Sequence, residues 1–394
     1  MYSPHKHSYL QSRSQGINPR IINRSVNLAR NQPTIESSDF EPPWNRLTSE
    51  QPCIPIDNID VTKRPVAFGR WALPKLRREL HDPDTDVVLQ AITSISDLVH
   101  DPEKGYEAIT LRIPDRMADL LAHNNPTIRE RACMALTTIA GLSDGRDAIV
   151  KNHVSLTNIA RLVEDAIDAV RIKAAALLEM ISRNWMASDY LIEAGFIPLL
   201  LDNVYKEKEE IVGLHLETLC SLMYGEGKTD ALQLGAFEIF LRLIEKGSNA
   251  IRSRAAYCLM MVTSTYNGKE MAYDASILPR LNVLLHEEDK EIYSSAAAAI
   301  MFCTTKSRAK LRAREIPHLP DRLVALTNHW HYPPAQLFSI KALTNICEHP
   351  EIRKEVGEKY LQRLENIVVG NNEDLKKHKE ILLSVINWVP WSNT

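Results

Sequence analysis

The feature that most constrains this chain is a short pattern that returns at nearly constant spacing. One copy is the run Ile128-Arg129-Glu130-Arg131-Ala132, followed by Leu136 and Ile139. The pattern recurs from Val170 and from Ile251, and weaker copies complete a series whose starts are 40 to 43 residues apart. This is the repeat length of helical solenoids, in which each repeat contributes two or three helices. The eight starts are Val87, Ile128, Val170, Ile211, Ile251, Ile292, Ala335 and Leu375.

Each repeat also has an internal pattern. Counted from its start, apolar residues at offsets 0, 4, 8 and 11 fall on one face of an α-helix. Offset 4 is mostly alanine, which lets neighbouring helices approach closely. An amphipathic helix precedes each start, and several repeats break at a glycine that we interpret as a helix C-cap with positive φ. These glycines are Gly105, Gly145, Gly227 and Gly268.

Three helices per repeat favour the armadillo fold over the HEAT fold. We therefore predict an all-α, armadillo-type right-handed superhelical solenoid of about eight repeats, spanning residues 60–390 and followed by a short tail, 391–394. A hydrophobic content of 44% and only 14 glycines agree with a large helical core.

Composition argues against several classes of partner. The net charge of −3 disfavours a surface built for nucleic acid or for an anionic membrane, and no apolar stretch is long enough to span a bilayer or to act as a secretory signal. The six cysteines are far apart and include no C-x-x-C pair, which indicates a reducing compartment such as the cytoplasm. We expect no cofactor, no metal and no small-molecule substrate.

Residues 1–59 lack the periodicity and are predicted to be a disordered arm. The first 35 residues contain five basic side chains and no acidic one. A plain flexible arm, an arm that docks on an acidic surface, and a mitochondrial transit peptide all fit this composition. The candidate docking residues are Lys6, Arg13, Arg20, Arg24 and Arg30.

Three motifs resemble catalytic or ligand sites. Residues 141–145 match the G-x-S-x-G nucleophile elbow, and residues 225–229 resemble the end of a phosphate-binding loop. Both need a preceding β-strand, whereas here a helical pattern precedes them. His329 and His331 lack a third ligand nearby and precede two prolines, so we interpret them as loop residues. The chain is therefore predicted not to be an enzyme.

Likeness to armadillo proteins implies that the third helix of each repeat lines a concave groove. Importin-type members carry tryptophan at offset 6 and asparagine at offset 10, and this chain has no such tryptophan and one such asparagine, which disfavours nuclear-import cargo. The remaining side chains at these offsets are rich in methionine and could either seat a partner helix or strand, or complete the core. The candidates are Met134, Thr138, Met180, Glu217, Tyr257, Met261, Phe302, Lys341 and Asn345.

Two segments carry a more specific resemblance. The start of the array, Ile59-Asp60-Val61-Thr62-Lys63, and the continuation Asp97-Leu98-Val99-His100-Asp101-Pro102-Glu103 resemble the radial spoke head fourteen homologue, or rhabdoid tumour deletion region protein, family. The likeness covers about residues 57–390. The chain departs from the family at Arg112, where the family has a small-residue turn, and at Pro74, which we expect to interrupt the first helix.

The resemblance implies a structural scaffold of the radial spoke in the axoneme of motile cilia and flagella. It implies other radial spoke proteins as partners, with the doublet microtubule surface as a further candidate for the basic arm, and a cytoskeletal location. The alternative is a cytosolic armadillo adaptor or an axonemal assembly factor.

Overall fold

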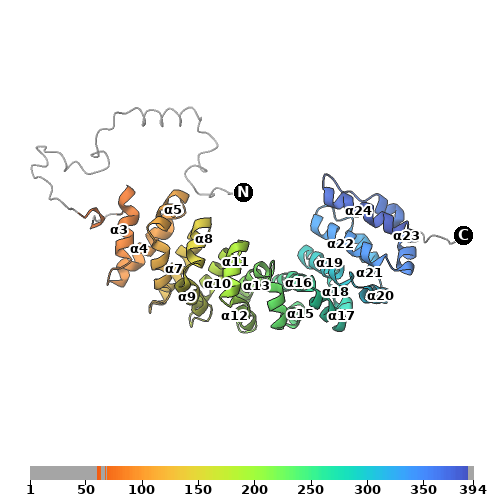
Figure 1. Ribbon diagram of the computed structural model, residues 1–394, viewed down its shortest axis with the longest axis horizontal. Coiled ribbons are helices and arrows are strands. Elements are labelled where there is room, and N and C mark those ends of the chain that lie inside the picture. Colours follow the sequence, from red (N-terminus) through yellow and green to blue (C-terminus); the bar gives the residue numbers. More distant parts are fainter. Residues whose placement is uncertain (1–59, 64–66, 68, 389–394) are drawn as a thin grey trace, which may run out of the picture. The chain divides into compact units, whose positions relative to one another are not determined.

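A computed structural model describes residues 60–63, 67 and 69–388 of this chain (Figure 1). These residues form 22 α-helices and two short 3-10 helices, Val61–Lys63 and Gly69–Trp71, with no strand among them. The arm with Lys6, Arg13, Arg20, Arg24 and Arg30, and the tail 391–394, lie outside the described residues. No helix in the described part is both long and apolar enough to cross a membrane. The chain divides into two compact units at Asn158 and Ile159.

The first unit contains repeats in which short helices precede a long one. The eight starts recognised in the sequence all fall in long helices, the first two of them in this unit. The α4 and α7 helices are its long helices and pack against each other. Its helices are α3 (Ala72–Glu79), α4 (Thr85–Leu98), α5 (Pro102–Thr110), α6 (Ile113–Leu120), α7 (Pro126–Ile139) and α8 (Ser143–Val150), and α9 (His153–Val163) contains the boundary.

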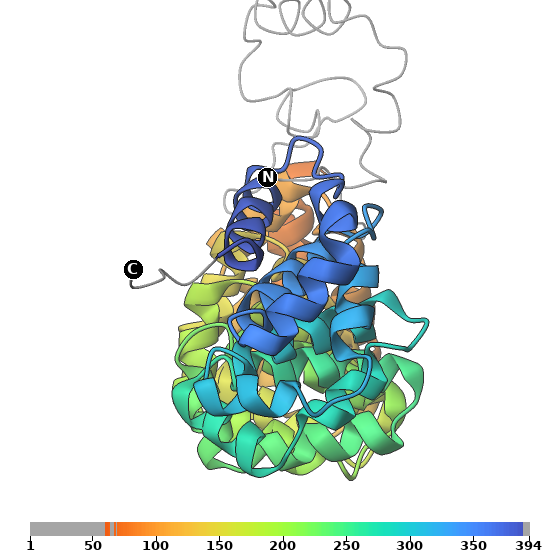
Figure 2. The ribbon, with the colours of Figure 1, turned by 90° about the vertical axis from the view of Figure 1, so that its right-hand side faces the viewer.

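The second unit continues the same order, and its long helices α10, α13, α16, α19, α22 and α24 pack one on the next (Figures 1 and 2). The last repeat differs, because one helix of 16 residues, α23, replaces the two short helices. The helices are α10 (Asp168–Ser182), α11 (Trp185–Glu193), α12 (Phe196–Asn203), α13 (Glu209–Leu222), α14 (Gly227–Gln233), α15 (Ala236–Lys246), α16 (Asn249–Thr263), α17 (Tyr266–Asp274), α18 (Leu278–Leu284), α19 (Lys290–Cys303), α20 (Ser307–Ala313), α21 (Leu319–Leu326), α22 (Pro333–Ile346), α23 (Pro350–Glu365) and α24 (Glu373–Ile386).

The core follows the predicted apolar stripe. In the inner repeats the side chains at offsets 0, 4, 8 and 11 are buried, as Leu178 at offset 8 of α10 illustrates. The first repeat departs from this register, since Val87 and Leu98 are half-buried while the following residues, Val88 and Val99, are buried. As the first long helix of the array, α4 has no long helix before it to fix its rotation.

Local hydrogen bonds explain where the helices begin. In the segment that resembles the spoke family, Asp101 caps α5 by accepting a hydrogen bond from the backbone N–H of Glu103 at 3.0 Å, with Pro102 at the first helical position. Our expectation that Pro74 interrupts the first helix is wrong. It is the third residue of α3, where a backbone N–H has no partner within the helix, so proline costs no hydrogen bond.

The explanation offered for the glycines is also wrong. None of the four lies at a positive φ, and Gly227 opens α14 against the carboxyl end of α13. A Cβ atom on Gly227 would lie 2.5 Å from the backbone oxygen of Leu222, so the repeats need glycine here for close approach of two backbones. Positive φ occurs instead at the residue before the second short helix of a repeat. This residue is Gly195 before α12 and Gly235 before α15, and it is Arg112, not a glycine, before α6.

Candidate protein-binding groove

A groove of about 860 Å³ runs along five successive long helices of the second unit, α10, α13, α16, α19 and α22. All of its lining comes from these helices and from the residues that precede α19 and α22. The lining residues are Glu179, Glu217, Cys220, Ser221, Ala250, Ser253, Arg254, Tyr257, Met260, Asp289, Glu291, Ser294, Ser295, Tyr332, Pro334 and Phe338.

The repeat register explains why these residues share one surface. On α16 they lie at offsets −1, 2, 3, 6 and 9, which fall on the helix face away from offsets 0, 4, 8 and 11. One face of each long helix therefore enters the core, and the opposite face is left to line the groove. The same positions from neighbouring repeats add up to a continuous wall because the helices stack in register.

The groove is acidic. Its lining has four carboxylates, Glu179, Glu217, Asp289 and Glu291, against one guanidinium, Arg254, which gives a formal charge of −4 + 1 = −3. Arg254 is already paired, because its Nη2 lies 2.6 Å from a carboxylate oxygen of Glu217. Of the other three carboxylates, Glu179 is paired at 2.6 Å with Arg183, which lies outside the lining, whereas Asp289 and Glu291 have no ion pair among the described residues.

Local contacts fix two of these carboxylates. Asp289 caps α19 by accepting a hydrogen bond from the backbone N–H of Glu291 at 2.8 Å. Glu291 in turn accepts a hydrogen bond from the hydroxyl of Ser253 on the neighbouring helix at 3.0 Å. The two acidic groups are thus held in place at the start of α19 and face the groove together.

Aromatic rings supply the other notable part of the lining. Tyr257 is 43% exposed, and Tyr332 and Phe338 lie further along. Burial raises the pKa of the Tyr257 and Tyr332 hydroxyls, so both remain protonated donors at neutral pH. The Nζ atom of Lys290 lies 5.3 Å from the centroid of the Tyr332 ring, which places this ring within cation–π distance of a basic side chain.

The structure separates the nine predicted groove residues. Of these, Glu217 and Tyr257 line the groove. The others in the second unit lie outside the lining. Half-buried there are Met180, Phe302 and Lys341, and Met261 is buried. Asn345 donates a hydrogen bond to the backbone oxygen of Met301 at 2.8 Å. In the first unit Met134 and Thr138 are half-buried, and the Thr138 hydroxyl donates to the Met134 backbone oxygen at 3.3 Å. Their part in binding stays a prediction.

The acidic lining was not predicted from the sequence. The predicted groove residues occupy offsets 6 and 10, whereas the lining also uses offsets −1, 2, 3 and 9. On α16, Met260 at offset 9 lines the groove although it is only 6% exposed, and Met261 at offset 10 is also buried but lies outside the lining. A search for acidic residues on the face opposite the core stripe finds Glu179 at offset 9 and Glu291 at offset −1.

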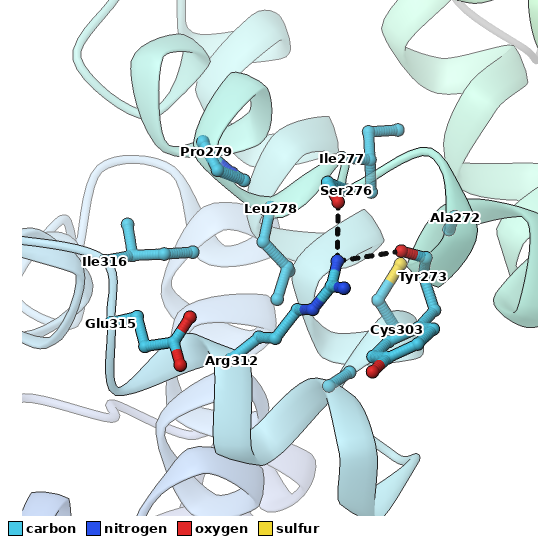
Figure 3. A pocket seen from close by; sticks show the side chains of 11 residues that line it. Ala272, Tyr273, Ser276, Ile277, Leu278, Pro279, Cys303, Arg312, Glu315 and Ile316 are labelled. Atoms are coloured by element: carbon cyan, nitrogen blue, oxygen red, sulfur yellow. Dashed lines mark hydrogen bonds between the residues drawn. The ribbon is translucent and has the colours of Figure 1, made fainter.

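A second cavity, of about 330 Å³, lies among α17, α18 and α20 (Figure 3). Arg312 points into it and donates through Nη1 to the backbone oxygen of Tyr273 at 3.2 Å and to the hydroxyl of Ser276 at 2.5 Å. Its guanidinium also lies 4.3 Å from the centre of the Tyr273 ring. These contacts join α20 to the turn between α17 and α18, so we assign Arg312 to holding the repeats together.

The motifs that resemble catalytic sites fall at helix starts. Ser143 begins α8 and lies beside Asp144, with its hydroxyl 3.4 Å from a carboxylate oxygen. Gly227 begins α14, directly after helix α13. His329 is 3.2 Å from the hydroxyl of Tyr293, and no group of three or more metal-binding side chains occurs within the described residues. Each motif therefore lacks the strand-to-helix context, or the third ligand, that its chemistry requires.

Comparison with known proteins supports the fold. No family model matches the sequence. An engineered protein of known crystal structure superimposes with a TM-score of 0.72 at 20% identity, over 80% of this chain and 78% of that one. Computationally designed armadillo repeat proteins for modular peptide recognition match with a TM-score of 0.55 at 21% identity, over 58% of this chain and 99% of theirs.

A designed armadillo repeat protein in complex with the peptide (KR)4 gives the same TM-score and identity, over 59% of this chain and 99% of its own. Together with the three-helix repeats, these likenesses define the class: the chain is an all-α, armadillo-type solenoid.

Proposed function

We propose that this chain is a non-enzymatic scaffold that holds an extended, basic segment of another protein in the groove of its second unit. The observation that carries the proposal is the lining itself, in which the unpaired carboxylates of Asp289 and Glu291, the exposed ring of Tyr257 and the half-buried rings of Tyr332 and Phe338 face one continuous channel. Carboxylates bind lysine and arginine head groups, and aromatic faces bind their cations and the apolar part of their side chains.

The shape of the groove favours an extended occupant. Five stacked helices present similar positions at regular intervals, so a chain lying across them meets one set of side chains per repeat. The designed armadillo protein bound to (KR)4 offers a precedent for a basic peptide on this fold. Because the lining here lacks the importin-type tryptophan and asparagine ladder, we expect recognition to depend mainly on charge and aromatic contact.

A direct test is the binding of fluorescently labelled (KR)4, followed by fluorescence anisotropy. The double variant Glu217→Lys with Glu291→Lys removes two carboxylates and adds two cations to the groove. Each exposed ion pair contributes roughly 0.2–1 kcal/mol, so with the added repulsion we expect affinity to fall at least about tenfold. The matched control, with the same change of charge, is Glu193→Lys with Glu238→Lys, two exposed residues of α11 and α15 outside the lining. Equal affinity for both variants would refute the groove assignment.

We further propose that the setting of this scaffold is the axonemal radial spoke of motile cilia and flagella, with other spoke proteins as its partners. Support comes from the resemblance at residues 59–63 and 97–103. A scaffold of the axoneme should stay with the pellet when detergent-treated axonemes are washed in high salt. Release into the supernatant would favour the alternative of a cytosolic adaptor or axonemal assembly factor.

The basic arm enters the proposal as a second contact. Five basic and no acidic side chains in residues 1–35 suit an acidic neighbour such as the doublet microtubule. Deleting residues 1–35 should weaken co-sedimentation with microtubules at low salt more than at high salt, because exposed charges are screened. Unchanged sedimentation would refute this role. The peptide test above is run with and without these residues, since a basic arm could compete for an acidic groove.

A further inference from the structure

Two cysteines from adjacent repeats meet in the wall of the groove. Cys220 lies on α13 and Cys258 on α16, and these two long helices pack against each other. Their sulfur atoms are 3.0 Å apart, and the Cys258 thiol also lies 3.5 Å from the backbone oxygen of Leu216. The residues are 38 apart in sequence, so the repeat, and not a local turn, brings the thiols together.

The two thiols differ in access. Among the five described cysteines, Cys220 alone is half-buried and lines the groove, whereas Cys133, Cys258, Cys303 and Cys347 are buried. Burial, together with the hydrogen bond to Cys220, raises the pKa of the Cys258 thiol. An oxidant that enters the groove therefore meets Cys220 first, with Cys258 directly behind it.

We propose that Cys220 and Cys258 form a reversible disulfide that is made when a peroxide oxidises the groove wall. This pairing was not predicted from the sequence, in which the cysteines are far apart and include no C-x-x-C pair. A disulfide requires sulfur atoms about 2.05 Å apart, so the thiols need to approach by roughly 1 Å, which side-chain rotation can supply.

The chemistry balances in two steps. The Cys220 thiol loses its proton, the thiolate attacks one oxygen of hydrogen peroxide and the O–O bond breaks, so that Cys220 becomes a sulfenic acid and the departing hydroxide takes up the thiol proton and leaves as water. The Cys258 sulfur then attacks the Cys220 sulfur, and the sulfenic hydroxyl leaves with the thiol proton as a second water molecule. Two thiols are oxidised to one disulfide and the peroxide is reduced to two water molecules. A thiol reductant reverses the change by exchange.

The bond would join α13, which carries the groove residue Glu217, to α16, which carries the groove residue Tyr257, and would fix the spacing of these helices. A further consequence, which rests on the proposed function, is that a peptide in the groove should cover Cys220 and slow its oxidation. The disulfide itself does not depend on that function, so the two ideas can fail separately.

The test uses the full chain, oxidised with hydrogen peroxide, blocked with N-ethylmaleimide and digested with trypsin without reduction. We expect mass spectrometry to find residues 209–228 linked to residues 255–269, and the link to disappear with dithiothreitol. Cys220→Ser should abolish the link, while Cys303→Ala, at a buried cysteine elsewhere in the unit, should leave it intact. Circular dichroism checks that each variant is folded.

Several results would overturn the proposal. One is a folded wild-type chain that gives Cys220 sulfinic acid without the link, and another is a link that appears only in denaturant. Slower oxidation with (KR)4 bound would support peptide occupancy of the groove. Formation of the link at the same rate with and without bound peptide would count against groove occupancy and leave the disulfide standing.

Discussion

His215 gives the most quantitative prediction, because it occupies a position that alanine fills in most other repeats. It lies at offset 4 of α13, is fully buried, and neither ring nitrogen has a hydrogen-bond partner among the residues that the structure describes. Burial lowers the pKa of the imidazole from 6.5 to about 4. A charged ring here would lose its hydration without gaining a partner, so the folded chain keeps His215 neutral.

The size of the effect follows from proton linkage. In the unfolded chain the imidazole binds a proton below its ordinary pKa of 6.5, whereas in the folded chain it does so only below about 4. Stability from this residue is therefore complete above pH 6.5 and falls as the pH decreases from 6.5 towards 4. At pH 5 the solution is 1.5 pH units below the unfolded pKa, which corresponds to a loss of about 2 kcal/mol at about 1.36 kcal/mol per unit.

The assay compares the free energy of unfolding of the wild type and of His215→Ala at pH 7 and pH 5. Urea unfolding is followed by circular dichroism and by tryptophan fluorescence, whose agreement checks that the transition is two-state. The substitution changes packing equally at both pH values, so the difference between the two pH values isolates the proton. We expect the wild type to lose about 2 kcal/mol more than His215→Ala between pH 7 and pH 5. Equal losses would refute the assignment of a buried neutral histidine.

Three other substitutions, one of them with a matched control, test the local structure of the repeats. Leu178→Ala should cost about 2–5 kcal/mol of unfolding free energy, and a cost below about 1 kcal/mol would contradict its place in the core. Gly227→Ala should be strongly destabilising in thermal unfolding, because the added Cβ would clash with the backbone oxygen of Leu222. The control is Gly225→Ala, whose added Cβ has no atom within 4 Å and which should therefore be neutral or slightly stabilising. Arg112→Gly should raise the free energy of unfolding by roughly 0.5–1 kcal/mol, because glycine adopts the left-handed backbone at this position without strain and only the exposed ion pair with Asp115 is lost. A lower denaturation midpoint would contradict this explanation.

The fold was largely predictable because one periodic signal is repeated eight times. A buried stripe at offsets 0, 4, 8 and 11 is a property of the helix, so its register can be read from residue types alone. The ends of the array were harder to predict. Val88 and Val99 replace Val87 and Leu98 in the core of α4, and no sequence pattern shows how a terminal helix rotates when it lacks a neighbour on one side.

The groove was harder to predict than the core. At offset 6, Glu217 and Tyr257 line the groove whereas Lys341 does not, and the acidic character of the lining comes from carboxylates at several offsets on different helices. Such a charge pattern is visible in the sequence only after the repeats are aligned on their buried face. The close approach at Gly227 could not be deduced either, because it depends on the distance between two backbones and not on residue type.

The central claim is that the groove, and not the outer surface, holds the partner segment. The most direct measurement places a photoreactive benzoylphenylalanine at Tyr257, in the groove, or at Val283, an exposed residue of α18 outside the lining, and irradiates each variant with (KR)4. We expect the peptide to be cross-linked at position 257 and unlabelled peptide to compete for this site, with little cross-linking at position 283. Cross-linking at 283 with none at 257 would contradict the central claim.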